Sequence, residues 1–146
     1  MKYTVEIEID LPRENVVALF DDPDNLKKWQ PDLVVFEHQS GELGQPGAKS
    51  RIVHQMGKRE VEMIETIVTR NLPDEFSGTY EAKGVWNKVE NRFYELGENK
   101  TKWTLDSEFQ CTGFMRVMAF LVPGMFKKQT AAFMKQFKDF AEKTGA

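Results

Sequence analysis

The sequence predicts an α+β fold in which an antiparallel sheet of seven strands packs against one long C-terminal helix. Residues 2–11 alternate between apolar and polar, residues 32–111 form short segments separated by turn residues, and residues 113–143 carry a helical apolar pattern. Because 146 residues is a common size for one folded unit, we expect a single domain over residues 1–146.

The composition predicts a soluble globular protein. Charged residues make up 29% of the chain and hydrophobic residues 40%, which excludes a disordered chain, a fibre or a membrane bundle. The net charge of −3 argues against nucleic acid as a partner, since binding nucleic acid needs a dense basic field. Cys111 has no second cysteine to pair with, and the first residues lack a signal-peptide pattern, so we expect a cytoplasmic location.

The first strand and two short helices are predicted from residues 2–31. One face of the strand is apolar and consists of Tyr3, Val5, Ile7, Ile9 and Leu11. Pro12 suits the first turn of a helix, because its missing N–H has no helical partner there, and this helix should end near residues 21–23. A second short helix, DNLKKW, should stop before Pro31, which forces the preceding residue out of the helical region.

Six antiparallel strands are predicted between residues 32 and 111, because only short turns separate the segments. Several segments alternate, which indicates one covered and one solvated face. The faces expected to be covered are Phe76, Gly78, Tyr80 and Ala82; Val85, Asn87, Val89, Asn91 and Phe93; and Trp103, Leu105, Ser107 and Phe109. In residues 60–70 alternation does not separate the two faces, so their register stays open.

The last element carries six of the eleven Phe and four of the seven Met residues. Residues 123–124, Pro-Gly, should kink or break it, because proline inside a helix removes a hydrogen bond and clashes one turn back. Beyond the break the helix is amphipathic, and we expect its apolar side to cover the concave face of the sheet.

Three segments carry a resemblance to a known group of proteins. They are VEIEIDLPRENVVALFDDPDNLKKW, NLPDEFSGTYEAKGVWNKVENRFYEL and FMRVMAFLVPGMFKKQTAAFMKQFKDF. Together with the order of elements, they make the chain similar to small bacterial members of the START-like superfamily, also called the SRPBCC or polyketide cyclase/dehydrase-like group, which includes the birch-pollen allergen type. The resemblance implies the helix-grip fold and an internal cavity for a hydrophobic or amphipathic molecule, but it does not identify a reaction.

Apolar candidates for the cavity wall come from the last helix. They are Met118, Leu121, Met125, Phe126, Phe133 and Phe137. Methionine chains adapt to irregular ligands because they are flexible and polarizable, although each of these residues could equally fill the core. Polar candidates lie on faces expected to point inward: His54, Tyr80, Asn87 and Asn91. They would either orient a ligand or form a satisfied core network, since burying a polar group without a partner costs about 1 to 3 kcal/mol.

Catalysis has a weaker basis in the sequence. His54 could act as general acid or base with Glu65 orienting it, because a neighbouring carboxylate tunes an imidazole toward working pH. Nothing in the spacing requires this pair. The chain has no nucleophile elbow, phosphate loop or dinucleotide fingerprint, and its two His and one Cys offer no metal-ligand cluster, so we expect neither cofactor nor metal.

A third class of function comes from residues 114–126, where Arg116 is the only charged residue. Thirteen residues are too few to span a bilayer, which needs roughly 20. From residue 113 onward the chain has six Lys and Arg against two Asp and Glu, whereas residues 1–112 carry 14 against 21. Either the lysines form a solvated face, or an apolar patch around Phe114 and Phe120 makes a transient membrane or homodimer contact.

The sequence therefore leaves three hypotheses. The first is a protein that binds or transports a hydrophobic or amphipathic small molecule, lipid-like or polyketide-like, between sheet and helix. The second is a cyclase or dehydratase that uses the same cavity. The third is an interaction module for a membrane or a protein.

Overall fold

The computed structural model describes residues 1–145 and contains seven strands and four α-helices. In chain order the elements are β1 (Lys2–Ile9), α1 (Arg13–Asp21), a 3-10 turn (Pro23–Asn25), α2 (Leu26–Trp29), β2 (Leu33–Ser40), β3 (Lys49–Met56), β4 (Arg59–Asn71), β5 (Glu75–Ala82), β6 (Val85–Gly97), β7 (Lys100–Cys111), α3 (Gly113–Leu121) and α4 (Met125–Gly145). The predicted first strand, two short helices, six further strands and C-terminal helix are confirmed.

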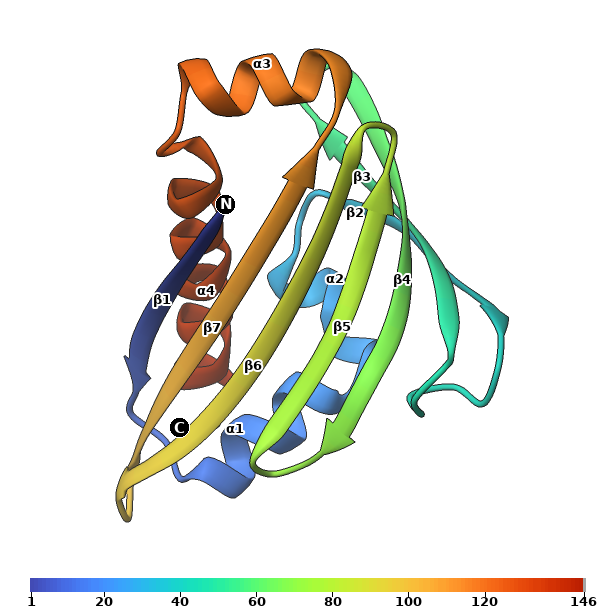
Figure 1. Cartoon of the computed structure of the whole chain (residues 1–146). Helices are drawn as coiled ribbons and strands as arrows, with labels where there is room; N and C mark the ends of the chain where they lie inside the picture. Colours follow the sequence, from blue (N-terminus) through green and yellow to red (C-terminus); the bar gives the residue numbers. More distant parts are fainter. Residues whose placement is uncertain (146) are drawn as a thin grey trace.

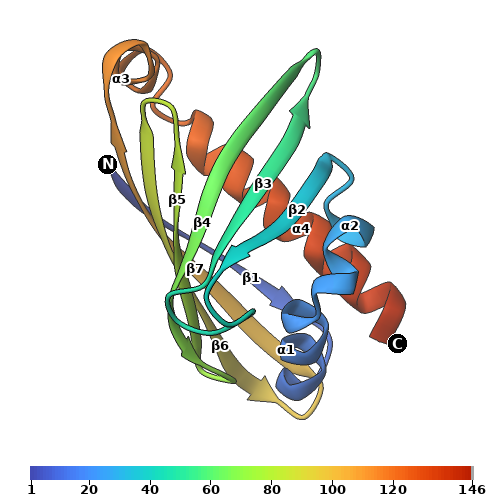
Figure 2. The ribbon, with the colours of Figure 1, turned by 90° about the vertical axis from the view of Figure 1, so that its right-hand side faces the viewer.

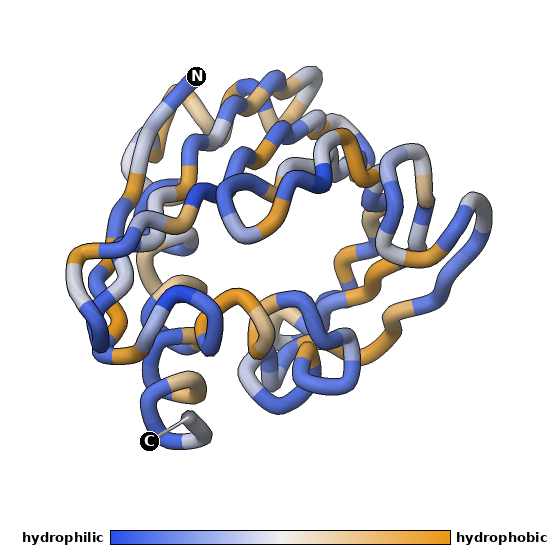
Figure 3. Tube along the Cα trace, turned by 90° about the horizontal axis from the view of Figure 1, so that it is seen from below, coloured by the Kyte–Doolittle hydropathy of each residue, from blue (hydrophilic) through white to orange (hydrophobic). Residues whose placement is uncertain are grey.

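All strand pairs are antiparallel, and the order across the sheet is β1-β7-β6-β5-β4-β3-β2. The sheet curves, and α4 crosses its concave side while α1 and α2 cover one end (Figures 1 and 2). Seen from the end that holds α1, the Cα trace runs around a central region between sheet and helices (Figure 3). The predicted α+β architecture is therefore confirmed.

The antiparallel strand directions give the sheet two distinct ends. The β2–β3, β4–β5 and β6–β7 connections lie at the end where α1 packs, which we call the α1 end. The β3–β4 and β5–β6 turns lie at the other end, where β7 runs into α3, and we call this the α3 end. The two ends differ in how completely the interior is filled.

Two features of β4 explain why the sequence pattern of residues 60–70 is ambiguous: Glu65 faces inward while Ile64 faces outward, and a β-bulge follows Ile67. The pairing of β4 with β5 shifts between Ile67 and Thr69, so residues on either side of the shift follow different alternations. Glu65 and Ile67 lie on the concave face before the bulge, and Arg70, opposite Phe76, lies on it after the bulge. A single alternation cannot describe a strand that contains an extra residue.

Two further local expectations hold. α1 follows Pro12 and ends at Asp21, whose carboxylate accepts two hydrogen bonds of 2.6 Å from the Arg70 guanidinium on β4. The C-terminal element is interrupted at Pro123-Gly124, so that α3 ends at Leu121 and α4 begins at Met125. α3 thereby lies across the α3 end of the sheet instead of continuing the line of α4 (Figure 1).

A cluster of aromatic rings holds α4 against the sheet at the α1 end. Phe93, Trp103 and Phe137 are 1%, 0% and 0% exposed. Phe20 of α1 contacts all three, with ring centroids 5.1, 5.7 and 5.8 Å away and edge-to-face geometry. Such pairs contribute about 0.5 to 1.5 kcal/mol each beyond the area they bury, so this cluster is the main contact between helix and sheet.

Replacing Phe137 by alanine is expected to lower the free energy of unfolding by about 3 to 5 kcal/mol, because the ring is fully enclosed. Urea unfolding followed by circular dichroism measures the change. Phe120→Ala is the matched control, since that ring is 85% exposed, and it should change stability by less than about 0.5 kcal/mol. Equal effects of the two substitutions would contradict the central role of the cluster.

Candidate functional site

The strand register identifies which side chains point toward α4. Phe93 and Trp103 are paired across β6 and β7, the Trp103 ring centroid lies 5.3 Å from that of Phe137, and all three belong to one buried cluster, so Phe93 and Trp103 lie on the concave face. Alternate residues along a strand, and residues directly opposite each other in neighbouring strands, lie on the same face of a sheet. This rule identifies residues of the concave face near the α3 end. They are His54, Met63, Glu65, Tyr80, Ala82, Val85, Asn87 and Val89.

These eight side chains are all partly exposed, although Ile52 and Ser107, which lie on the same face beside Met63 and Val89, are buried. At the α1 end Phe93, Trp103 and Ile67 are buried, while Phe76 and Arg70 are partly exposed. Since the eight side chains face the helix and not the outer surface, water reaches them through the space between sheet and α4. The interior is thus more completely filled at the α1 end and more accessible at the α3 end. This contrast, read from burial and register, defines the candidate site.

Glu65 and Tyr80 form a hydrogen-bonded pair within this site. They face each other across β4 and β5, and the Tyr80 hydroxyl donates to Glu65 Oε2 at 2.9 Å. In residues 1–145 the other oxygen, Oε1, has no hydrogen-bond partner and is not fully buried. One carboxylate oxygen therefore remains free to meet a guest molecule or water.

The pKa values of both Glu65 and Tyr80 are raised above their ordinary values. Burial raises the pKa of the Glu65 carboxyl, and the hydrogen bond from Tyr80 partly opposes this by favouring the charged form. Burial, together with the nearby Glu65 charge, raises the pKa of the Tyr80 hydroxyl well above its ordinary value. The phenol stays neutral, while the carboxyl keeps its proton to higher pH than it would at the surface.

His54 does not meet Glu65, so the catalytic pair considered from the sequence does not form. Glu65 is opposite Ser50 on β3, and His54 lies four residues further along that strand, about 13 Å away. Burial lowers the pKa of the His54 imidazole, and the charge of Asp32 works against this. His54 remains a partly exposed polar group near the start of β2.

The two asparagines have different roles. Asn91 is 6% exposed, accepts from Trp103 Nε1 at 2.9 Å and donates to the Phe76 carbonyl at 3.2 Å, so both ends of its amide are used in the core. Asn87 is partly exposed and donates to Ser107 Oγ at 2.8 Å. Of the two, only Asn87 keeps surface facing the open part of the interior.

The candidates from the C-terminal helices are distributed over three environments. Phe126 and Phe137 are buried, the former stacked on Phe109 with centroids 4.4 Å apart. Leu121 is 64% exposed on α3. Met118, Met125 and Phe133 are partly buried, and Phe133 lies 4.7 Å from Trp29 and 6.4 Å from Trp103, between centroids. Phe133 thus lies beside the sealed aromatic cluster.

Two features were not identified from the sequence. Trp29 is 3% exposed and packs on Phe133 and Phe137, yet within residues 1–145 its indole Nε1–H has no acceptor. A buried donor of this kind needs a water or ligand oxygen. The Tyr3 hydroxyl lies 2.6 Å from Thr130 Oγ1 and donates to the Phe126 carbonyl, which fastens the first turns of α4 to β1. The apolar position of Tyr3 and the spacing of Phe126 and Thr130 could have indicated the second feature.

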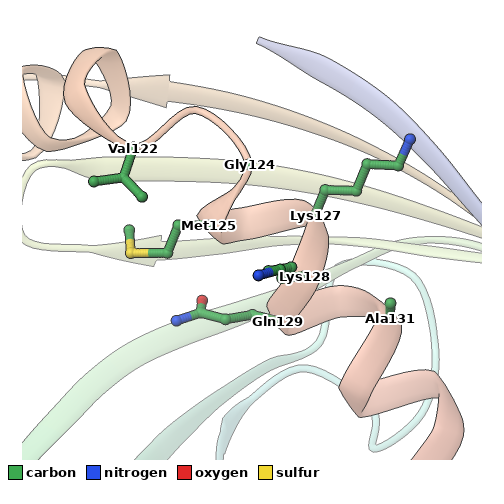
Figure 4. Close-up of a pocket in the computed structure, with 7 residues that line it drawn as sticks. All are labelled: Val122, Gly124, Met125, Lys127, Lys128, Gln129 and Ala131. Carbon is green, nitrogen blue, oxygen red and sulfur yellow. The ribbon is translucent and has the colours of Figure 1, made fainter.

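A separate surface pocket of about 650 Å³ lies at the junction of α3 and α4 (Figure 4). Its lining residues are Val122, Gly124, Met125, Lys127, Lys128, Gln129 and Ala131. No strand contributes to it, so it is distinct from the interior site. In the part of the chain that the structure describes, no group of three or more His, Cys, Asp or Glu is arranged to hold a metal ion.

A seven-stranded antiparallel sheet that grips a long C-terminal helix defines the helix-grip fold. The chain belongs to the family described as polyketide cyclase / dehydrase and lipid transport, which it matches over residues 1–142. No curated protein matches the sequence.

Solved structures share the fold at low sequence identity. A protein of Thermus thermophilus is 18% identical with a TM-score of 0.80, over 100% of both chains. The Zhui aromatase/cyclase from a Streptomyces species is 11% identical with a TM-score of 0.84, over 100% of this chain and 96% of that one. A START superfamily protein from Mycobacterium smegmatis is 12% identical with a TM-score of 0.82, over 98% of each chain. The resemblance to this superfamily and the helix-grip fold are confirmed.

The raised pKa of Glu65 predicts a pH-dependent difference in stability. The folded state holds the Glu65 proton above the ordinary pKa of 4.5, so this group's contribution to the free energy of unfolding falls as pH rises from 4.5 through the folded pKa. The free energy of unfolding of Glu65→Gln minus that of wild type is therefore expected to increase as pH rises from 4.5 through the folded pKa of Glu65. Above that pKa this difference should stay constant. Urea unfolding at a series of pH values measures this, with Glu95→Gln at an exposed position as control. A difference independent of pH would contradict the shift.

Proposed function

We propose that the protein binds a hydrophobic or amphipathic small molecule between α4 and the sheet at the α3 end. The observation that carries the proposal is the partial exposure of most inward-pointing side chains at this end, compared with the buried aromatic cluster of Phe93, Trp103 and Phe137 at the α1 end. A guest here would replace water on apolar wall groups such as Met63, Val89 and Phe133, which contributes roughly 25 cal/mol per Å² of apolar area before the costs of association.

Polar groups in the site would select the guest. The Oε1 atom of Glu65 can accept a hydrogen bond from a hydroxyl or phenol group, and the protonated form of the carboxyl also donates to a carbonyl. The Tyr80 oxygen, whose proton is donated to Glu65, can accept a further hydrogen bond. We therefore expect a mostly apolar molecule with one or two oxygen functions.

The comparisons support this class of guest. The family description includes lipid transport, and a similar structure is that of a START superfamily protein. Norcoclaurine synthase from Thalictrum flavum, 13% identical with a TM-score of 0.72, is described in complex with dopamine and hydroxybenzaldehyde. Both of those compounds combine an aromatic body with oxygen groups, as the walls of this site would favour.

An enzyme of the cyclase or dehydratase kind is the second candidate, and the Glu65–Tyr80 pair favours it. A carboxyl whose pKa is raised by burial keeps its proton to higher pH than a surface carboxyl does, which favours transfer of that proton to or from a reacting group. This pair takes the place of the His54–Glu65 pair, which the register separates. The family description and the aromatase/cyclase neighbour support the same candidate.

Native mass spectrometry of the protein purified from its own host tests the proposed binding, followed by denaturing extraction of what is released. We expect an apolar mass in stoichiometric amount. Phe133→Trp should remove it, because the larger ring fills space beside Trp29, while the free energy of unfolding changes by less than about 1.5 kcal/mol. Tyr94→Trp, at an exposed position on the opposite face of β6, is the matched control and should keep the adduct. An undiminished adduct in Phe133→Trp would remove this helix face from the site.

Incubating the released compound with fresh protein distinguishes carrier from enzyme. For an enzyme, mass spectrometry should show loss of one water or another constant mass change with time. Glu65→Gln should abolish that change while still binding the compound, and His54→Ala should keep it. An unchanged mass with the wild-type protein would establish a carrier, and loss of turnover in His54→Ala alone would assign the proton transfer to that residue instead.

A further inference from the structure

α3 presents an apolar face to solvent. Its exposed side chains, with that of the following residue, are Phe114 at 71%, Val117 at 52%, Phe120 at 85%, Leu121 at 64% and Val122 at 43%. The first four fall within about a third of the helix circumference, given 100° per residue. No residue of α3 is buried, although its sequence is apolar all round. Such a concentration of exposed rings on a short helix marks a contact surface.

α3 is held to the rest of the chain by few contacts, and these lie on its other side. The Thr112 amide donates to the Gly84 carbonyl at 2.9 Å, and Met115 packs against Gly84 in the β5–β6 turn. Met115, Met118 and Ala119 are the half-buried residues of the helix. The apolar arc that contains Phe114 and Phe120 therefore faces away from the protein.

The surroundings of this face are positively charged. Arg116 lies on α3, Lys127 and Lys128 open α4 and line the junction pocket, and Lys83 lies in the β5–β6 turn beside α3. Within the described residues 1–145 none of these four cations forms an ion pair. From residue 109 to residue 138 the chain has no Asp or Glu, although the whole protein carries a net charge of −3. An acidic protein thus gathers unpaired cations around its most exposed aromatic rings.

The combination of exposed rings and unpaired cations fits an anionic lipid surface. Aromatic and aliphatic side chains enter the boundary between headgroups and acyl chains, and lysine or arginine beside them meets the phosphates. A second copy of the chain fits less well, because a symmetric contact would place Arg116, Lys127 and Lys128 near their own copies. No helix among residues 1–145 is long and apolar enough to cross a membrane, so the contact would lie in the plane of the interface.

We infer that α3 and the adjoining α3–α4 junction dock the protein on an anionic bilayer, with Phe114 and Phe120 inserted and with Arg116, Lys127 and Lys128 against the phosphates. The pocket beside Lys127 and Lys128 receives part of a lipid headgroup or chain (Figure 4). Docking in this orientation brings the accessible end of the interior to the membrane, so an apolar guest could exchange without crossing bulk water. Docking itself needs no bound guest, so its test is independent of the proposed function.

Co-sedimentation with vesicles tests the inference. The wild-type protein should bind vesicles of equimolar phosphatidylcholine and phosphatidylglycerol at low salt, bind phosphatidylcholine vesicles much less, and lose binding as salt rises. Phe120→Asp should lower the partition coefficient by roughly tenfold or more, because it replaces the most exposed ring by a charge. Leu43→Asp, at an exposed apolar position in the β2–β3 connection at the α1 end, is the matched control and should bind like wild type.

A second pair of variants tests the charges. Lys127→Ala with Lys128→Ala should lower binding about 25-fold, since each lysine near an anionic surface contributes about fivefold. Lys100→Ala with Lys143→Ala, which removes the same charge at the α1 end, should have little effect. Absence of wild-type binding to anionic vesicles, or binding unchanged in Phe120→Asp, would overturn the inference. So would a dimer in analytical ultracentrifugation that Phe120→Asp dissociates while no variant changes vesicle binding.

Discussion

The packing of aromatic rings between α4 and the α1 end of the sheet is the contact on which the rest of the structure depends. Trp103, Phe93 and Phe137 exclude water completely there, and Phe20 closes the cluster from α1. Because this cluster fixes the position of α4, the helix need not fill the other end to stay in place. The Tyr3 hydroxyl and the stacking of Phe126 on Phe109 hold its first turns along one edge of the sheet instead.

An accessible interior also changes how polar groups behave. Asn91, beside the sealed cluster, has both ends of its amide bonded, as burial without water requires. Glu65 keeps one oxygen unpaired, which is tolerable only where water or a guest can reach it. The same low-dielectric surroundings that raise the pKa of Glu65 would strengthen any hydrogen bond it makes to a bound molecule.

The fold was predictable because its elements follow clear periods and turn signals, from the alternation in β1 to the Pro-Gly break before α4. The site was predictable only in part. His54, Tyr80 and Asn87 were placed on inward faces correctly, but the partner of Glu65 depended on the β4 register, which alternation does not reveal where a charged Glu65 faces inward and an apolar Ile64 faces outward. Phe133 and Phe137 show the other limit. Both lie on the apolar helix face and both pack on Trp29 and Trp103, but Phe137 also packs on Phe20 of α1 and is fully buried, whereas Phe133 is partly exposed.

The two ends of this molecule therefore differ in role for one physical reason. A domain of this size has enough apolar surface to close one core, and here that core is concentrated at the α1 end. The apolar residues that remain, on the inner face near Glu65 and on α3, stay in contact with water. Around α3 this apolar surface is flanked by the cations Arg116 and Lys127. Burial of these apolar side chains against a guest or a lipid surface lowers the free energy because it removes them from water. The inner face near Glu65 and the exposed face of α3 therefore favour the same kind of partner, one with an apolar surface.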